Sequence, residues 1–544
     1  MNLRRLADLP LLLVAGLLVL PVLAVFASWL SWNAASGQIL REMGATVLPD
    51  YALTSLVLCL AVGIGAAAVG TATAAAVTLF DFPGRRAFEW ALLLPLAMPA
   101  YVVAYAYTDF LQFSGPLQTW MRSQFGLEGR VFPEVRNLPG AICVFVFSLY
   151  PYVYLLVRTA LAERAAQLME AARLLGAPLA RRIRTVALPL ARPAIMAGVA
   201  LALMETLADF GVASYFGIQT FSAGIYKAWL AMDNRIAAAQ LATVLLLVVA
   251  VLLALETRAQ KRLRFTAGRA RGGAEAQPVL LRGGRRLAAW ALCAAPILFG
   301  FVLPVVFMLR PLAADWTVLP WDRFLQWSLN SLRLGALSAA LAVATAVLLA
   351  YRLRRSPRGI TRGVVQIAAL GYAVPGAVLV VGLLLPVGWL QQAWPQSGVG
   401  YWMTATVLGI VWAYLVRFVS VALQSVQSGY ARIPGSLDDS ARMLGTSGPA
   451  LLARVHWPLL KRSTAAAALL VFVDVMKELP ATLVLRPFNS DTLAVVAYQL
   501  ARDERLGEAA LPSLALVLVG LVPVVLLSRT LRAAPVTALE LAHP

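Results

Sequence analysis

Lysine, histidine and cysteine are all scarce in this chain of 544 residues. None of the four lysines follows a glycine, so the chain lacks the GxxxxGK[ST] loop that cradles the phosphates of ATP, and it cannot itself be an ATP-hydrolysing motor. There is no HExxH or GxSxG motif, and there are only two histidines. Cys59, Cys143 and Cys293 lie singly inside apolar runs, which favours packing thiols over a disulfide or a metal site. We therefore expect no tight metal site and no cofactor bound by this chain.

Apolar residues make up 60% of the sequence and the mean hydropathy is +0.77, too apolar for a soluble protein with a polar surface. Runs long enough to cross a ~30 Å hydrocarbon core as helices predict twelve membrane spans, six in each half. The fold class we expect is an all-α polytopic membrane protein. The predicted spans are 10–31, 53–79, 88–110, 139–161, 194–216, 237–256, 287–309, 331–351, 364–390, 403–427, 464–485 and 509–528.

The net charge of +20 has its source in short loops that alternate along the chain. If Arg4 and Arg5 lie in the cytoplasm, most of the 46 Lys and Arg residues fall on the same side, as the positive-inside rule requires. This arrangement predicts that both termini are cytoplasmic. A nucleic-acid partner is not expected, because no basic groove with interleaved aromatic residues is present. The lipid bilayer accounts for the charge distribution.

One polar stretch occurs twice, with an offset of 269 residues. Glu170-Ala171-Ala172, Gly176 and Leu188-Pro189 recur as Asp439-Ser440-Ala441, Gly445 and Trp457-Pro458. Each glycine can adopt the left-handed conformation that ends a helix, so each copy is predicted to form a helical elbow between two spans. Because both halves carry six spans, both elbows should lie on one face of the membrane.

The repeated stretch resembles the EAA loop of ABC-transporter permeases. The resemblance implies two tandem six-helix repeats of the type I ABC importer permease fold, with EAA loops at 162–193 and 428–463. It also implies that two copies of a cytoplasmic ABC ATPase, which bind ATP and Mg²⁺, dock on the elbows. The residues at those contacts would be Glu170, Ala171, Ala172, Gly176, Leu188, Pro189, Asp439, Ser440, Ala441, Gly445, Trp457 and Pro458.

The composition also predicts where the repeats begin and end. We expect a first repeat over residues 1–256, a second over 287–544, and between them a basic cytoplasmic linker, 257–286, rich in Gly, Ala and Arg. Two six-span halves in tandem have the same orientation, so a pseudo-two-fold axis along the membrane normal should relate them.

Ionisable residues inside the spans are the candidates for a transport path, because they are costly in a bilayer. Glu205 and Asp209 lie in the fifth span, and the offset places Asp474 and Glu478 at the equivalent positions. A spacing of four residues predicts that each pair shares one helix face. A local ion pair with Lys477 is the alternative in the second half. Pro95 and Pro99 predict a break or a kink in the third span, which would border the path or serve helix packing alone.

The flanking strings narrow the resemblance to one branch. Residues 99–110, 204–211 and 477–483 are similar to the fused ferric-iron permeases of bacterial importers. That resemblance implies a periplasmic substrate-binding protein that delivers Fe³⁺, a location in the bacterial inner membrane, and a path to which Tyr101 and Tyr105 contribute. Thiamine, phosphonate and polyamine permeases remain alternatives. A further alternative is a secondary, ion-coupled transporter, which would explain the carboxylates but not the duplicated elbow.

Overall fold

The structure is a computed structural model, and it describes residues 3–31, 34–162, 166–267, 278–314, 316–317, 319–355 and 359–532. These residues are almost entirely helical. The two strands among them, β1 (Phe80–Asp81) and β2 (Val279–Leu280), pair in parallel over two residues. The predicted all-α class is therefore confirmed.

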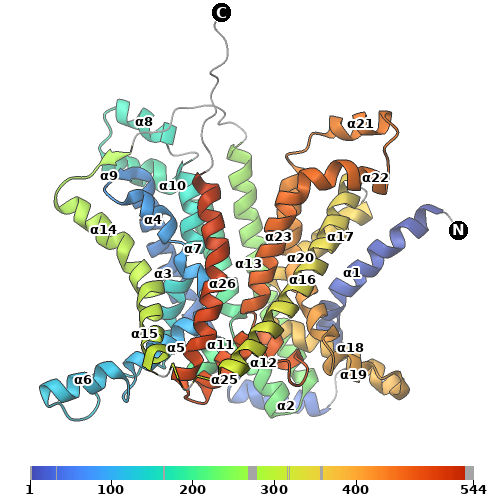
Figure 1. The fold of residues 1–544 in the computed structure, drawn as a ribbon, viewed down its shortest axis with the longest axis horizontal. Coiled ribbons are helices and arrows are strands. Elements are labelled where there is room, and N and C mark those ends of the chain that lie inside the picture. The colour runs from blue at the N-terminus through green and yellow to red at the C-terminus, as the bar shows by residue number, and fades with distance from the viewer. Residues whose placement is uncertain are drawn as a thin grey trace, which may run out of the picture.

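The first half contains long spanning helices interrupted by short ones (Figure 1). Its elements are α1 (Leu3–Ala27), η1 (Ser28–Ser31), α2 (Ala34–Ala45), α3 (Leu48–Leu79), α4 (Arg85–Ala91), η2 (Leu94–Ala97), α5 (Ala100–Leu111), α6 (Pro116–Phe125), α7 (Leu138–Ala160), α8 (Ala166–Leu174), α9 (Leu179–Arg182), η4 (Ile183–Ala187), α10 (Leu188–Ala208), α11 (Gly211–Phe216), α12 (Phe221–Tyr226), η5 (Lys227–Ala231) and α13 (Arg235–Ala267).

The second half repeats this order. Its elements are α14 (Gly284–Ile297), η6 (Leu298–Val302), α15 (Leu303–Ala314), α16 (Trp321–Arg355), α17 (Gly359–Ala369), η7 (Gly371–Ala373), α18 (Gly376–Ala393), η8 (Pro395–Ser397), α19 (Val399–Thr404), α20 (Leu408–Tyr430), α21 (Gly435–Met443), α22 (Pro449–Leu451), η9 (Leu452–His456), α23 (Trp457–Lys477), α24 (Pro480–Leu485), α25 (Leu493–Arg502) and α26 (Leu506–Arg532). From η4 to α11, each element begins and ends 269 residues before its counterpart between η9 and α24.

Each half has a three-helix centre. Helices α3, α7 and α10 pack together in the first half, and α16, α20 and α23 do so in the second. Small residues permit the close approach of these helices: a Cβ added to Gly198 would lie 2.6 Å from the Cα of Val153. The same need for close backbone contact explains Gly70 of α3, where an added Cβ would lie 2.8 Å from the carbonyl oxygen of Tyr150.

The two halves exchange their outer helices. Helix α1 packs against α18 of the other half, and α15 packs against α5. Helix α13 also contacts α18, and α26 contacts η2. The elbows, α8 with α9 and α21 with α22, lie at one end of the molecule, here called the elbow end, and α11, α12 and α25 lie toward the opposite end (Figure 1).

The predicted count of twelve spans is roughly matched. Ten described helices are long and apolar enough to cross a membrane, and the bent pair Arg85–Ala97 and Ala100–Phe125 makes an eleventh, with an angle of 87°. Helix α23 covers most of the predicted span at 464–485 but carries Lys461, Arg462, Asp474 and Lys477, so it is not among those ten.

Several predicted spans are broken where the sequence runs on without a polar interruption. The third and ninth spans break at Pro99 and Pro375. These prolines have φ of −60° and −59° and directly precede the first residues of α5 and α18. The sequence predicts a break or a kink at Pro99, and the structure has the break. The sequence predicts continuous fifth and eleventh spans, which is wrong, because α10 ends at Ala208 and α23 at Lys477.

The predicted linker is partly built from regular elements. Helix α13 continues to Ala267, and β2, which pairs with β1, lies within the linker range. Leu281 also donates its N–H to the carbonyl of Asp81 at 3.0 Å. Residues 268–277 lie outside the described residues, so the linker's course between these two elements stays a prediction.

Candidate docking elbows and transport path

Both elbows have the same turn. Gly176 has φ +77° and Gly445 has φ +79°, and each N–H bonds back to the carbonyl three residues earlier, Arg173 or Arg442. Glu170 forms an ion pair with Arg173 at 3.5 Å, and Asp439 forms one with Arg442 at 3.2 Å. Two polar residues of different length, Glu and Asp, therefore occupy equivalent surface positions.

The elbow surfaces also expose residues that the sequence analysis did not single out. Leu174 and Leu175 are 82% and 87% exposed, and their counterparts Met443 and Leu444 are 89% and 85% exposed. Large apolar side chains this exposed at the tip of a polar loop mark an interaction surface. Their position directly before each glycine, within an otherwise polar stretch, is the signal that could have identified them.

The remaining predicted docking residues lie around these tips. Leu188 and Trp457, at the starts of α10 and α23, are 37% and 51% exposed. Ala171 and Ala172 line a cup of about 450 Å³ in the first elbow, together with Pro189. In the second elbow Ser440 and Pro458 are exposed, whereas Ala441 is buried.

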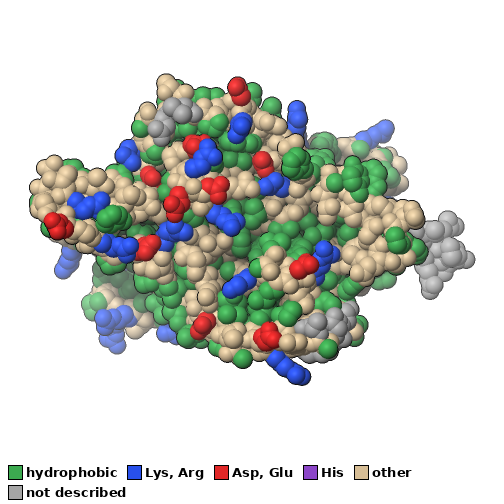
Figure 2. All heavy atoms as spheres, turned by 90° about the horizontal axis from the view of Figure 1, so that it is seen from below, with side chains coloured by type: hydrophobic (Ala, Val, Ile, Leu, Met, Phe, Trp, Pro, Cys, Tyr) green, Lys and Arg blue, Asp and Glu red, His purple; other side chains and the backbone are tan. Residues whose placement is uncertain are grey.

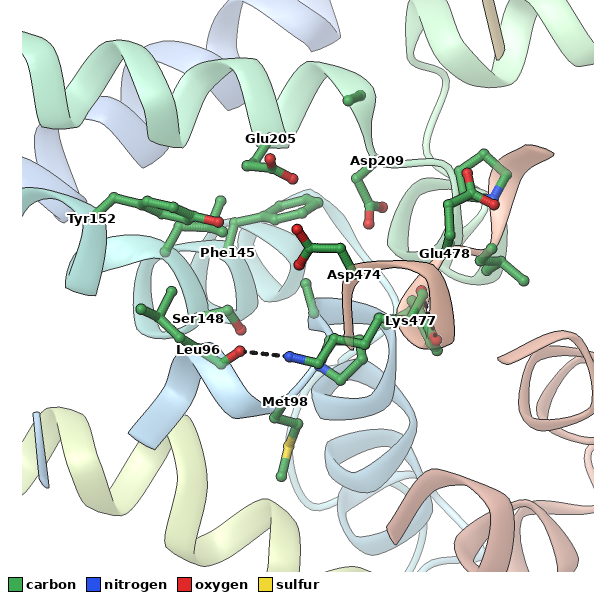
Figure 3. A pocket seen from close by; sticks show the side chains of 18 of the residues that line it. Leu96, Met98, Phe145, Ser148, Tyr152, Glu205, Asp209, Asp474, Lys477 and Glu478 are labelled. Atoms are coloured by element: carbon green, nitrogen blue, oxygen red, sulfur yellow. Dashed lines mark hydrogen bonds between the residues drawn. The ribbon is translucent and has the colours of Figure 1, made fainter. Parts of the chain in front are cut away.

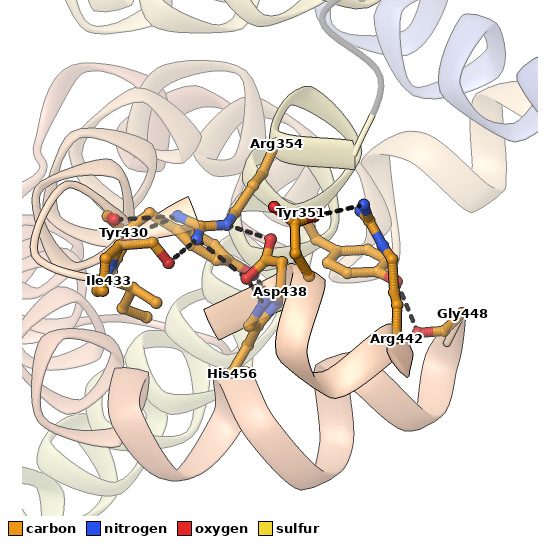
Figure 4. Close-up of polar contacts among 10 residues, drawn as sticks. Tyr351, Arg354, Tyr430, Ile433, Asp438, Arg442, Gly448 and His456 are labelled. Carbon is orange, nitrogen blue, oxygen red and sulfur yellow. Dashed lines mark hydrogen bonds and ion pairs between the residues drawn. The ribbon is translucent and has the colours of Figure 1, made fainter. Parts of the chain in front are cut away.

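A buried polar network anchors the second elbow (Figure 4). Arg354, near the end of α16, donates Nε to Asp438 Oδ2 at 2.7 Å and Nη2 to Oδ1 at 3.0 Å. His456 Nε2 lies 3.0 Å from the same carboxylate, and Tyr430 lies 3.3 Å from His456 Nδ1. The hydrogen bonds from Arg354, and then that from His456, hold the pKa of Asp438 below its usual range even though partial burial opposes them.

The first elbow has apolar residues at nearly every matching position. Met169, Ala187 and Leu161 take the places of Asp438, His456 and Tyr430, and all three are buried. Arg85 matches Arg354, but it pairs with Glu89 at 3.3 Å and donates to the Val77 carbonyl at 2.6 Å. The same elbow is thus held by hydrophobic packing in one half and by a charged network in the other.

A cavity of about 190 Å³ lies between the halves and gathers the predicted path residues (Figure 3). All four carboxylates, Glu205, Asp209, Asp474 and Glu478, line it, as does Tyr101. Tyr105 does not; its buried ring lies against Tyr101, with ring centroids 5.6 Å apart, and against Tyr215, 4.6 Å away. The cavity therefore combines residues that are hundreds of positions apart in the sequence.

Asp209 and Glu478 perform a structural task at the breaks in α10 and α23. Asp209 Oδ1 accepts the N–H of Val212 at 2.8 Å, and Glu478 accepts the N–H of Ala481 and of Thr482, both at 3.0 Å. They cap α11 and α24, as acidic residues do at helix N-termini. Since each is the first residue beyond its long helix, the prediction that each acidic pair shares one helix face was wrong.

Both basic residues of the cavity come from the second half. Arg417 of α20 forms an ion pair with Glu478 at 3.3 Å, and both side chains are almost fully buried. Lys477 donates Nζ to the carbonyl of Leu96 in the first half, at 3.0 Å. Within the described chain Lys477 forms no ion pair with Asp474, so the predicted alternative of a local pair is not realised. Ser148 and Ala208 match Arg417 and Lys477 in the first half.

The cavity has oxygen donors but no ready-made metal centre. No group of three or more His, Cys, Asp or Glu side chains in the described ranges could hold a metal ion. Hydrogen bonds join the halves on either side of the cavity: Tyr101 donates to the Lys477 carbonyl at 3.3 Å, and Tyr226 donates to the Pro480 carbonyl at 2.7 Å. The arrangement is a polar chamber at the interface of two repeats, the usual position of a transport site.

The amino-acid sequence is similar to those of known transport permeases. Residues 66–265 match the family model described as "Binding-protein-dependent transport system inner membrane component". The Fe(3+)-transport system permease protein FbpB 2 of Haemophilus influenzae is 25% identical over 483 residues, which are 87% of this chain and 88% of that relative. The Escherichia coli sulfate transport system permease protein CysW is 28% identical over 211 residues, 38% of this chain and 67% of that protein. A putative 2-aminoethylphosphonate transport system permease protein, PhnU of Salmonella typhimurium, is 26% identical over 238 residues, 42% of this chain and 82% of its own length.

Proposed function

We propose that this chain, a permease of the binding-protein-dependent transport family, is the complete membrane channel of an ATP-driven importer of ferric iron. The observation that carries the proposal is the chamber at the interface of the two halves, which four carboxylates line. The similarity to a named Fe(3+) permease, which extends over 87% of this chain, supports the same cargo.

The charge of the chamber favours a cation over the oxyanions named for the other relatives. Four carboxylates face only two basic side chains, Arg417 and Lys477, among the residues that line the cavity. A sulfate or a phosphonate would lie beside a net excess of negative charge. Fe³⁺ is a hard cation that prefers oxygen ligands, which carboxylates and tyrosines supply.

Each elbow is proposed to seat one copy of a cytoplasmic ABC ATPase. The exposed apolar tips, Leu174-Leu175 and Met443-Leu444, would enter the contact, with Glu170 and Asp439 beside them. The ATPase would supply ATP and Mg²⁺ binding, which this chain lacks the sequence motif to provide. Two equivalent elbows on one chain match two ATPase subunits.

The opposite end of the molecule is proposed to receive a periplasmic substrate-binding protein. Acidic and basic side chains are interspersed over that face, with apolar residues between them (Figure 2). Mixed charges of this kind suit a transient protein contact, because complementary charges on the partner can orient it on this face. The elbow end and both termini would then lie in the cytoplasm, and the chain would span the inner membrane.

The test is uptake by a strain that lacks the chromosomal transporter and carries this chain with its ATPase and binding protein. Radiolabelled ferric iron, sulfate, 2-aminoethylphosphonate and thiamine are supplied in parallel. We expect ATP-dependent accumulation of iron alone. Uptake of another substrate without iron would overturn the assigned cargo, and iron uptake that persists after ATP depletion would favour an ion-coupled carrier.

A further inference from the structure

The four carboxylates of the chamber form two pseudo-symmetric pairs with different surroundings. Asp209 and Glu478, one pair, accept backbone N–H groups at the starts of α11 and α24. Glu205 and Asp474, the other pair, are also 269 residues apart, and within the described chain neither side chain has a hydrogen bond or an ion pair. Each is partly exposed to the chamber.

A second observation points to an occupant between these two carboxylates. Ser148 is only 3% exposed, lines the chamber, and has no hydrogen-bond partner for its hydroxyl among the described residues. In Figure 3 the hydroxyl points into the same space as the Glu205 and Asp474 carboxylates. A buried hydroxyl without a partner is costly, so a site that leaves one open is suited to a ligand.

The basic residues of the chamber make their short contacts elsewhere and form no ion pair with Glu205 or Asp474 in the described chain. Arg417 is committed to Glu478, and Lys477 to the Leu96 carbonyl. Ser148 is the first-half counterpart of Arg417, so the position that carries a cation in one half carries only a hydroxyl in the other. The first-half wall, with Glu205 and Ser148, is therefore the more negative side.

We propose that Glu205 and Asp474, one from each half, together with the hydroxyl of Ser148, are the contact point of the cation in transit, whereas Asp209 and Glu478 hold the broken helices. This inference rests on the proposed cation cargo. Two carboxylates and one hydroxyl supply hard oxygen donors without completing a coordination shell. The nearby charges of Arg417 and Lys477 weaken retention, as a conduit that must release its ion requires.

The first experiment compares two variants that both remove negative charge from the chamber. Glu205→Gln with Asp474→Asn removes the contact pair, and Asp209→Asn removes the charge of a cap while keeping a side chain that caps equally well. We expect the double variant, which loses two charge-assisted contacts, to lower the rate of radiolabelled iron uptake at least about tenfold. The Asp209→Asn control should stay within about threefold of the wild type, at equal membrane abundance.

The second experiment measures ion binding without transport. Tb³⁺ prefers oxygen donors as Fe³⁺ does, and tyrosines near a bound Tb³⁺ sensitise its luminescence; Tyr152 and Tyr372 both line the chamber. The purified complex should give sensitised emission that the double variant loses and Asp209→Asn keeps. If the double variant falls in abundance, the single Glu205→Gln variant replaces it in both experiments.

The outcomes separate this inference from the proposed function. Normal iron uptake and undiminished Tb³⁺ emission in the Glu205 and Asp474 variant would overturn the contact point while leaving the iron permease intact. An equal loss in Asp209→Asn would also overturn it, because general acidity of the chamber would then suffice. Absence of iron uptake by the wild type would instead refute the proposed cargo.

Discussion

The two halves of this protein have nearly the same backbone but stabilise it differently. Both elbows turn on a glycine with a positive φ, +77° at Gly176 and +79° at Gly445. The helix that follows each elbow, α10 or α23, ends at the equivalent position, Ala208 or Lys477. Yet a network of Arg354, Asp438 and His456 anchors the second elbow, and buried Met169 and Ala187 replace the latter two in the first.

The same contrast extends into the chamber, where the second half supplies Arg417 and Lys477 and the first supplies Ser148 and Ala208. A duplicated fold thus needs its turns, breaks and caps in both copies, because these determine the path of the chain. The side chains that pair with buried charged groups can differ between the two halves. The most informative substitutions are therefore those made at matched positions of the two halves.

The largest difference is expected at Arg417 and Ser148. Arg417→Leu leaves Glu478 as a buried charge without its partner, which costs about 3–5 kcal/mol. Ser148→Ala removes a buried hydroxyl that has no protein partner in the described chain, so the stability should stay the same or rise slightly. Thermal unfolding of the purified variants in detergent measures both. Equal losses would show that Arg417 does not carry the stability assigned to its ion pair.

A smaller difference is expected between Arg354 and Arg85. Arg354→Met removes hydrogen bonds to a carboxylate whose side chain is only 10% exposed, a loss of about 1.5–3 kcal/mol. Arg85→Met breaks a pair with Glu89 that is about one-quarter exposed, so about 1 kcal/mol or less should be lost. Protease sensitivity of each elbow would locate the effect. Cleavage that increases at the first elbow rather than the second would contradict the comparison.

The smallest difference, close to zero, is expected between Gly176 and Gly445. A Cβ on either glycine meets nothing within 4 Å, so valine is disfavoured only by its left-handed backbone, at about 1–2 kcal/mol in each half. Gly176→Val and Gly445→Val should weaken ATPase co-purification to a similar extent. Wild-type recovery of the ATPase with both glycines changed would refute the docking role of the elbows.

Local features of the sequence predicted much of this organisation. Spans and elbows were accessible because hydrophobic run length and a repeat at a fixed offset are properties of neighbouring residues. The equivalence of Glu205 and Asp474 was accessible from the offset alone. The breaks after Ala208 and Lys477 were not, because the apolar runs continue through them and only the caps at Asp209 and Glu478 reveal them.

Contacts between residues that lie far apart in the sequence could not be predicted, for a different reason. Arg417 meets Glu478 from another helix, and Lys477 reaches the first half, so neither contact leaves a local pattern. The polar network of the second elbow likewise joins three helices, α16, α20 and α21, to the turn η9. Helix packing places these groups together, and a single sequence carries no record of that packing.

The central claim is that one chain supplies both halves of the permease and that each half seats one ATPase. Native mass spectrometry of the complex purified with its ATPase measures this directly. The account predicts one copy of this chain with two ATPase subunits, and one subunit after disruption of either elbow by Gly176→Val or Gly445→Val. Two copies of this chain in the complex, or a single ATPase subunit bound to the wild type, would contradict it.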